Sequence, residues 1–403
     1  MNFDCNRRKW VEAFTPWKRD PKEAPYSPDV VIEATRLSGM EQDVYLYPLN
    51  RHLNIFTKRA ALKVSTSVVS LKSYSGGKEI FQCSGTIIES VNAYSIVLTT
   101  ASLLRCSTSR NSLAENIKVI VHLFDGRSFD GQIESYDFHY NVAAIKILSD
   151  TPLPIASLAH ISDSITIFPS QLQVTVEKPF QLGPHSNSFD LIPGDSVIAL
   201  SRFYAKPYNI MAAPGEFSID RCDSDFDCKE LFMASCRIMR CGIGGALINR
   251  YGEVIGICFN DFGCLAFLPI NIASMWWEHY KKYRQVRRPW LGMEVTNLYA
   301  ARLHTLEQII SKFPDVLKGV IVEEVVPGSS AESAGLKHND VIIQFGGKRI
   351  QSFLELLENM WNNVGESVEL AVIRASHDVP LYLSMVVEEA TSDKLYSWPL
   401  WEV

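Results

Sequence analysis

From about residue 61 onward, the chain is a succession of short apolar or alternating runs separated by turn residues. The runs include VSTSVVSLKSY, YSIVLTTASLL, NIKVIVHLF and NVAAIKIL, and the turns include Ser75-Gly76-Gly77 and Asp125-Gly126. Many short strands at this spacing are typical of an antiparallel β-sandwich or β-barrel. The pattern continues through DSVIALSRF and GGALINRYGEVIGICFN. We therefore predict a mainly β domain over residues 61–288.

A helical pattern and a proline mark the end of this domain. Residues 271–288, NIASMWWEHYKKYRQVRR, carry apolar and aromatic residues at helical spacing, which predicts a closing helix. The end of this segment carries five cations, Lys281, Lys282, Arg284, Arg287 and Arg288. They could form a phosphate-binding patch, but we prefer to interpret them as a solvated helix end. After Pro289 we expect a smaller α+β domain over 289–390, with strands near 291–296, 319–325, 340–345, 367–374 and 380–386 and helices near 302–312 and 351–363.

The two ends of the chain differ from these domains. Residues 1–60 mix charge, proline and aromatic residues, as in FTPWKRDPKEAPYSPD, and are interpreted as an N-terminal arm with one short helix, while residues 391–403 form a C-terminal tail. The start, MNFDCNRRKWVEAF, lacks the apolar stretch of a secretory signal, and no run approaches the roughly 18–20 apolar residues that cross a bilayer. We expect an intracellular protein, cytoplasmic or nuclear, without a membrane span.

Composition narrows the classes of function. The net charge of −6 argues against nucleic acid as a main partner. Nine cysteines, an odd number, are scattered without a CxxC pair or a Cys/His zinc spacing, so we expect reduced thiols rather than a disulfide framework or a zinc site. No cofactor is predicted.

Several blocks, in order, resemble those of one family. LTTAS is similar to the LTAAH strand end that holds a catalytic histidine, YNVAAIKI to the block that holds an aspartate, and CGIGGALIN to GNSGGPLLN, which holds the serine. PGDSVIAL, GEVIGI and LAFLPI match neighbouring strands, and RPWLGMEV and GVIVEEVVPGSSAESAGLKHNDVIIQFGGKRI match the second domain. The chain thus resembles the HtrA/Deg (Do-like) serine proteases, of the plant Do-like type, over roughly residues 61–390. This resemblance implies a chymotrypsin-like double β-barrel followed by an α+β PDZ domain.

The residues at the three catalytic positions depart from the family pattern. Ser102 stands where the family has its general-base histidine, Asn141 where it has the orienting aspartate, and Ile243 where it has the nucleophilic serine. Acyl transfer by this route needs a hydroxyl to attack, an imidazole to take its proton and a carboxylate to orient the imidazole. Isoleucine has no nucleophilic atom, and a serine hydroxyl is no base near neutral pH. We predict that the chain is not an active enzyme.

The oxyanion hole and the rival nucleophiles follow from the same alignment. The resemblance places the two oxyanion-hole N–H groups at Cys241 and Ile243, and a side chain at position 241 restricts a turn in which the family has glycine. Cys241 is the best rival nucleophile, but it would still need a base. The remaining candidates are better explained as turn, packing or strand residues: Ser75-Gly76-Gly77, Ser84-Gly85, His122 and His139.

The loop DRCDSDFDCKE suggests a calcium site through Asp223, Asp225 and Asp227. An EF-hand loop needs glycine at its sixth and glutamate at its twelfth position, where this chain has Cys228 and Ala234. A solvated loop is the better interpretation. Cys222 and Cys228 in this loop would form a disulfide only in an oxidising setting. We predict no metal site.

The PDZ-like half retains its binding residues. PDZ domains add a peptide as an extra strand and receive its carboxylate in a turn of backbone N–H groups. By resemblance, that turn is Trp290, Leu291, Gly292 and Met293, although the same stretch would also suit the start of a buried sheet. The chain's own end, SWPLWEV, is an apolar-x-apolar terminus, so docking of Trp401–Val403 into such a groove is an alternative.

We therefore expect a catalytically inactive HtrA/Deg-like pseudoprotease that binds protein or peptide termini through its PDZ domain. The alternatives are an active serine endopeptidase of the same family and a chaperone-like holdase. By resemblance, active HtrA/Deg relatives are candidate partners, and a homo-trimer would form through upstream aromatic residues such as Trp10, Phe14, Trp17 and Tyr26. The connection over 148–193 is longer than the usual family connection, and serves as either a partner surface or an enlarged loop.

Overall fold

In the computed structural model, the described residues are 50–91, 93–106, 111–166, 189–219, 228–260, 265–391, 394–396 and 398. They all belong to one compact unit, Tyr47–Val403. The aromatic residues proposed for a trimer contact, the acidic-loop aspartates and Trp401–Val403 lie outside the described residues, as do residues 167–188 of the 148–193 connection.

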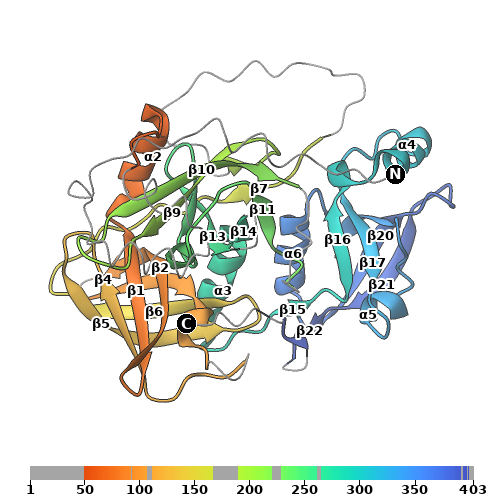
Figure 1. The fold of residues 1–403 in the computed structure, drawn as a ribbon. Coiled ribbons are helices and arrows are strands. Elements are labelled where there is room, and N and C mark those ends of the chain that lie inside the picture. The colour runs from red at the N-terminus through yellow and green to blue at the C-terminus, as the bar shows by residue number, and fades with distance from the viewer. Residues whose placement is uncertain are drawn as a thin grey trace, which may run out of the picture. The chain divides into compact units, whose positions relative to one another are not determined.

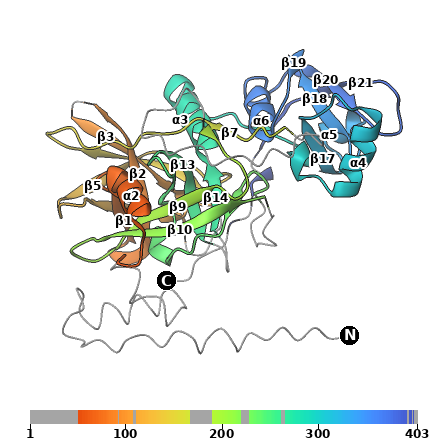
Figure 2. The same cartoon turned by 90° about the horizontal axis from the view of Figure 1, so that it is seen from above.

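Helix α2 (Ile55–Ser65) precedes the first strand and begins at Asn54, whose side chain accepts a hydrogen bond from the Thr57 N–H. The run VSTSVVSLKSY is therefore helical up to Ser65 and becomes a strand only at Val68. Figure 2 shows α2 lying across the outside of the barrel strands, and it packs against β9, β10 and β12.

The first barrel is closed and antiparallel, with strand order β1-β2-β3-β6-β5-β4 and β4 pairing back to β1. Its strands are β1 (Val68–Ser75), β2 (Lys78–Val91), β3 (Tyr94–Thr100), β4 (Ile117–His122), β5 (Ser128–Asp137) and β6 (Val142–Leu148). A short 3₁₀ turn, η3 (Ala101–Leu104), follows β3.

The second barrel is also closed, with the order β10-β11-β14-β13-β12-β9. Figure 1 shows β9, β10, β11, β13 and β14 of this barrel. It consists of β9 (Ser196–Arg202), β10 (Ile210–Ser218), β11 (Phe232–Ala234), β12 (Ala246–Asn249), β13 (Val254–Asn260) and β14 (Leu265–Pro269), with η4 (Arg240–Gly242) before β12. The short strands β7 (Ile161–Ser162) and β8 (Phe189–Asp190) pair in parallel. Two closed barrels confirm the predicted chymotrypsin-like architecture.

Helix α3 (Ile270–Tyr283) packs on β13 and β14 and ends before residue 288 because Arg284 adopts a left-handed conformation. The observed helix therefore ends five residues earlier than expected. Arg284, Arg287 and Arg288 lie beyond it and pair with Glu134, Glu389 and Asp137. These ion pairs favour the structural interpretation of the cations over a phosphate-binding patch.

The C-terminal domain is built on a sheet with the order β16-β17-β18-β20-β21, to which β19 adds beside β18. Its strands are β16 (Met293–Asn297), β17 (Val320–Val325), β18 (Val341–Phe345), β19 (Lys348–Arg349), β20 (Ser367–Ile373) and β21 (Leu381–Val386), and β15 (Pro289–Trp290) pairs separately with β22 (Glu388–Glu389). The helices are α4 (Leu303–Lys312), α5 (Ser330–Ser333) and α6 (Phe353–Trp361), with η5 (Leu298–Ala300) after β16.

One buried pair stabilises this domain. Arg374 donates through Nε and Nη2 to the two carboxylate oxygens of Asp340, each at 2.7 Å, and Asp340 is fully buried. Arg374 also donates to the Gly335 carbonyl, which ties the turn after α5 to β18 and to the end of β20.

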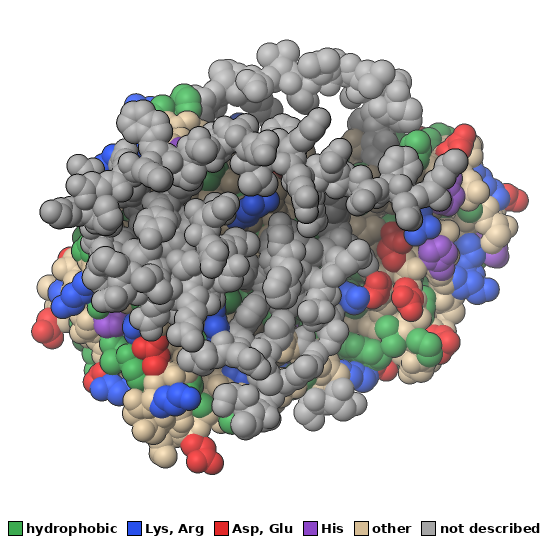
Figure 3. Space-filling view, in the orientation of Figure 1, with side chains coloured by type: hydrophobic (Ala, Val, Ile, Leu, Met, Phe, Trp, Pro, Cys, Tyr) green, Lys and Arg blue, Asp and Glu red, His purple; other side chains and the backbone are tan. Residues whose placement is uncertain are grey.

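Acidic and basic side chains are interspersed on the described part of the face in Figure 3, with no single basic patch there. None of the described helices is long and apolar enough to span a bilayer.

Candidate functional site

Ser102 and Asn141 lie next to each other at the mouth of the first barrel. Ser102 is in the η3 turn that follows β3, Asn141 precedes β6, and the Ser102 hydroxyl donates to Asn141 Oδ1 at 3.1 Å. The Ala101 N–H donates to the Asn141 carbonyl at 3.0 Å, which holds the two turns together. Both side chains are buried. The pair is neutral, and neither group accepts a proton near neutral pH.

Ile243 is part of the hydrophobic core, with only 1% of its surface exposed. Its carbonyl accepts a hydrogen bond from the Ser84 N–H at 2.9 Å, which fixes the turn against β2 of the first barrel. The next residue, Gly244, has φ +76°, and a Cβ there would lie 2.6 Å from the Ser84 carbonyl oxygen. The glycine therefore permits the close approach of the turn to β2, and the position of the family nucleophile is filled by packed hydrocarbon.

The oxyanion-hole turn directs its hydrogen bonds inward. At the end of η4, the Ile243 N–H donates to the Arg240 carbonyl at 3.1 Å, and at its start the Gly242 N–H donates to the Met239 carbonyl at 2.8 Å. The Ser84 hydroxyl donates to the Cys241 carbonyl at 2.7 Å. An oxyanion hole needs N–H groups that point at an incoming oxygen, and the Ile243 N–H is already used within the turn.

The rival nucleophiles are also buried. Burial raises the pKa of the Cys241 thiol to about 12, so it is not a thiolate at neutral pH. The Ser84 hydroxyl accepts from the Arg202 N–H at 2.9 Å as well as donating to Cys241, so it is part of the packing between the barrels.

The two candidate histidines do not serve these groups. His122 Nδ1 lies 2.7 Å from the Ser128 hydroxyl on the neighbouring strand. His139 is buried, and within the described part of the chain its ring nitrogens have no hydrogen-bond partner. Burial, with a contribution from the nearby charge of Arg288, holds the pKa of His139 well below its ordinary value.

Among the residues that the structure describes, no group of three His, Cys, Asp or Glu side chains is placed to hold a metal ion. Cys228, at the end of the acidic loop, is a buried free thiol near Glu230.

The predicted carboxylate-binding stretch forms the turn that leads into β16. Gly292 has φ +64°, and a Cβ there would lie 2.7 Å from Ser329 Cβ, so the turn requires glycine. Leu291 and Met293 are buried, and Trp290 is partly buried. Strand β16 lies at the edge of its sheet, next to α6, as peptide addition requires.

Residues of strand β11 and of the loop before it contact this same edge. Lys229 forms an ion pair with Glu294 at 2.9 Å, and Phe232 lies 6.2 Å, centroid to centroid, from Phe353 at the start of α6. A small cavity remains between them, lined by Phe217, Lys229, Leu231, Val295, Thr296 and Tyr299 among others.

Asp163 reinforces this contact. Its Oδ2 accepts a hydrogen bond from Asn297 Nδ2 at 2.8 Å. The same oxygen accepts a hydrogen bond from the N–H of Leu354, which is in the first turn of α6, at 3.4 Å. Burial raises the pKa of this carboxyl, and the hydrogen bond from Asn297 opposes the rise. The contacts of Asp163, Lys229 and Phe232 cover the edge along which a peptide would add.

Comparison with known proteins places the chain in a family. A model of the trypsin-like peptidase domain matches residues 83–257, and a model of the PDZ domain matches residues 289–384. "Putative protease Do-like 14" of Arabidopsis thaliana is 32% identical over 390 residues, covering 92% of this chain and 79% of that protein. The chain belongs to the HtrA/Deg family.

More distant relatives agree with this placement. The periplasmic serine endoprotease DegP of Salmonella typhimurium is 27% identical and is matched over 75% of this chain and 56% of its own length. The chain thus spans about half of that relative. Among solved structures, the HtrA-type protease AlgW with tripeptide has a TM-score of 0.52 at 20% identity, over 83% of this chain and 97% of that one, which shows the shared fold.

Some residues at this site escaped the sequence analysis. Asp163 lies in the long connection, where nothing in the sequence indicates that its carboxylate accepts hydrogen bonds from Asn297 and from the first turn of α6. Glu230 follows the acidic loop and appears in the sequence as one more charge, yet it is buried and accepts a hydrogen bond from Tyr396. Contacts of this kind join segments more than 130 residues apart, so no local pattern indicates them.

Proposed function

We propose that the chain is a catalytically inactive member of the HtrA/Deg family, a pseudoprotease that acts as a protein-binding scaffold or regulator. The observation that carries the proposal is the arrangement at the three catalytic positions. The hydroxyl of Ser102 donates to the amide oxygen of Asn141, and Ile243 is packed into the core. This arrangement holds neither a nucleophile nor a base for acyl transfer.

Cleavage of an unfolded casein-type substrate tests this proposal. The parent chain is compared with the triple variant Ser102→His, Asn141→Asp and Ile243→Ser. No cleavage by the parent is expected. Cleavage that a serine-directed inhibitor abolishes would favour the alternative, an active serine endopeptidase, and would mean that another nucleophile operates.

The PDZ domain supplies the binding activity in this proposal. Gly292 and the edge strand β16 have the geometry for peptide addition, and the family match over 289–384 supports it. Because Lys229 and Phe232 contact that edge, a peptide has to displace them. Its apparent affinity is therefore reduced to the fraction of molecules in which the edge is uncovered.

Binding of peptides with free carboxyl termini tests this part. A peptide with a free carboxylate is expected to bind more tightly than its amidated form, and Gly292→Ala should remove the difference because alanine is strained at φ +64°. Equal binding of the two forms by the parent would argue against carboxylate recognition. Suppression of aggregation without preference for a free terminus would favour the holdase alternative.

Assembly and location complete the proposal. From the resemblance to the HtrA/Deg family, we propose that the chain joins oligomers of active family members or forms a homo-trimer, which light scattering of the chain alone and of mixtures would detect. An intracellular location, cytoplasmic or nuclear, is proposed from the sequence alone, in which nine scattered cysteines do not suggest a disulfide framework. Imaging of the tagged protein tests it, and recovery from a secretory compartment would contradict it.

A further inference from the structure

The segment after the last strand packs against both barrels. Trp398 has 1% of its surface exposed and is among the largest fully buried side chains. Its indole N–H donates to the His139 carbonyl at 2.9 Å, and its ring lies 4.8 Å from that of Phe259. Trp398 is thus held through both a polar and an apolar contact.

Tyr396, two residues before Trp398, also packs against His139. Its ring stacks on His139 with centroids 4.2 Å apart and planes 21° from parallel, and its side chain hydrogen-bonds Glu230. The carboxylate of Glu230 is buried, and its Oε1 has no hydrogen-bond partner within the described part of the chain. The hydrogen bond from Tyr396 thus partly offsets the cost of burying this carboxylate.

Lys394 attaches the same segment to the PDZ domain. Its ammonium group pairs with Glu388 at 2.8 Å and lies 3.7 Å from the ring centroid of Trp290, the first residue of the predicted carboxylate-binding turn. The tail thus contacts both barrels through Tyr396 and Trp398 and the PDZ domain through Lys394.

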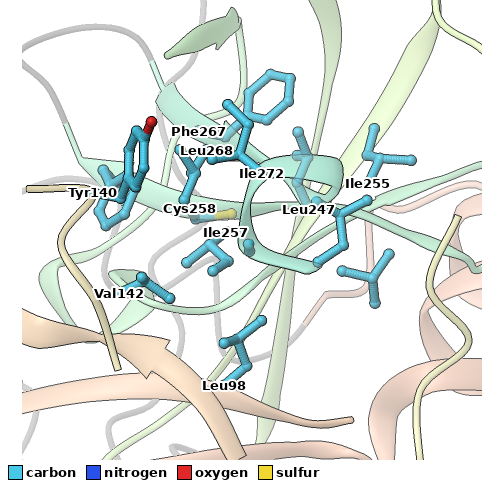
Figure 4. Packing of buried hydrophobic residues seen from close by; sticks show 14 of the residues in the cluster. Leu98, Tyr140, Val142, Leu247, Ile255, Ile257, Cys258, Phe267, Leu268 and Ile272 are labelled. Carbon is cyan, nitrogen blue, oxygen red and sulfur yellow. The ribbon is translucent and has the colours of Figure 1, made fainter. Parts of the chain in front are cut away.

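The place that receives the two aromatic rings adjoins the degenerate triad. His139 precedes Asn141 by two residues, and Phe259 follows Cys258, whose carbonyl accepts from the Gly244 N–H at 2.8 Å, next to Ile243. The neighbouring Tyr140 points into the same cluster as Cys258 and Phe267 (Figure 4). One aromatic segment therefore bridges the turn of Asn141 and the strand beside the turn of Ile243.

We propose that His139, Glu230 and Phe259 form a second peptide-binding site, here called the tail seat, which recognises a Tyr-x-Trp segment and is filled in cis by Tyr396 and Trp398. The side chains of the segment are what is recognised: the indole N–H of the tryptophan donates to the His139 carbonyl, the phenol of the tyrosine donates to Glu230, and the two rings pack on Phe259 and His139. This differs from the recognition of a terminal carboxylate by a PDZ groove. The segment follows β22, so it can leave the seat without breaking a strand pair.

Binding of a labelled peptide to the full chain tests the tail seat. The peptide is ATSDKLYSWP, the sequence of residues 390–399, with an amidated carboxyl terminus so that a carboxylate-binding groove does not select it. The receptor is the full chain carrying Tyr396→Ala and Trp398→Ala, which vacates the seat but keeps the tail. This variant should bind one peptide about tenfold or more tightly than the parent, since the parent's own segment competes.

Two controls locate the binding. Adding Phe259→Ala to the receptor, or replacing the tryptophan of the peptide by alanine, should each weaken binding about tenfold or more. Equal binding by the parent and by the vacated variant, or binding that survives both controls, would overturn the proposal.

A milder variant covers the case in which the double variant does not fold. Trp398→Phe keeps an aromatic ring in the seat and removes only the N–H that donates to His139. It should bind the peptide about threefold or more tightly than the parent, whereas Tyr382→Phe, a change at an exposed aromatic residue of β21, should match the parent. An unchanged affinity of Trp398→Phe would contradict the tail seat.

Discussion

Ile243→Ser restores the family's nucleophile residue, and the structure predicts that it destabilises this chain. The isoleucine has four side-chain carbons with 1% of its surface exposed, and serine keeps one of them. The loss of about three methylene equivalents at about 0.8 kcal/mol each amounts to about 2.4 kcal/mol, before any term for the cavity. With that term we expect a loss of about 3 kcal/mol of unfolding free energy, and of about 1 kcal/mol for Ile243→Val.

Urea unfolding followed by tryptophan fluorescence measures both changes. The matched control is Ile155→Ser, because Ile155 has 56% of its surface exposed and should lose at most about 0.5 kcal/mol. A loss for Ile243→Ser no larger than that of Ile155→Ser would refute the conclusion that position 243 is a packed core position.

Three further predictions concern other buried groups. Arg374→Met leaves the buried carboxylate of Asp340 without its charged partner and with a hydrogen bond from the Lys337 N–H, and it should cost the PDZ domain about 3–5 kcal/mol by denaturant titration, while a cost below about 1 kcal/mol would refute the structural role of the pair. His139 has a lowered pKa because it is buried, so the folded state favours its neutral form. The protein is therefore not destabilised by this histidine above about pH 6.5, and it loses up to about 1.4 kcal/mol of unfolding free energy per pH unit as the pH falls below that value. Thermal unfolding at pH 6.5 and 5.5 should therefore show a smaller acid loss in His139→Gln than in the parent, and equal losses would contradict this. Cys241, buried with a raised pKa, should resist iodoacetamide at pH 8 in the native chain and react after unfolding, whereas the half-buried Cys106 should react in both states; fast native labelling of Cys241 would contradict its burial.

The fold was largely predictable because its signals are local. Alternating runs and Gly-containing turns indicated a β-sandwich or barrel, and the family resemblance indicated two barrels and the turn at Gly292, where the backbone has φ +64°. The boundaries were less predictable. The stretch before Val68 contains β-branched residues, but the Asn54 cap and the helix-forming residues behind it make it helical up to Ser65.

The chemistry of the site was predictable only as far as residue types allow. Ser102, Asn141 and Ile243 indicate from the sequence that a nucleophile and a base are missing. The sequence does not indicate that the Ile243 N–H is used within its own turn, because that depends on the backbone path of Arg240–Gly242.

The contacts around the C-terminal tail were not predictable. Docking of the last three residues into the PDZ groove stays a hypothesis, as these residues lie outside the described part of the chain. The structure instead packs Tyr396 and Trp398 against His139 and Phe259. These pairs are joined by packing across large sequence separations, which no periodicity or spacing rule reports.

The absence of an activated serine is the central claim, and labelling with a fluorophosphonate probe tests it most directly. Such a probe reacts with a serine hydroxyl only where a base activates it. The folded parent should show no adduct by intact mass, and neither should Ile243→Ser alone, because Ser102 cannot take the proton from a new hydroxyl. A stoichiometric adduct on the parent, blocked by a serine-protease inhibitor, would contradict the account and would identify the serine that acts in its place.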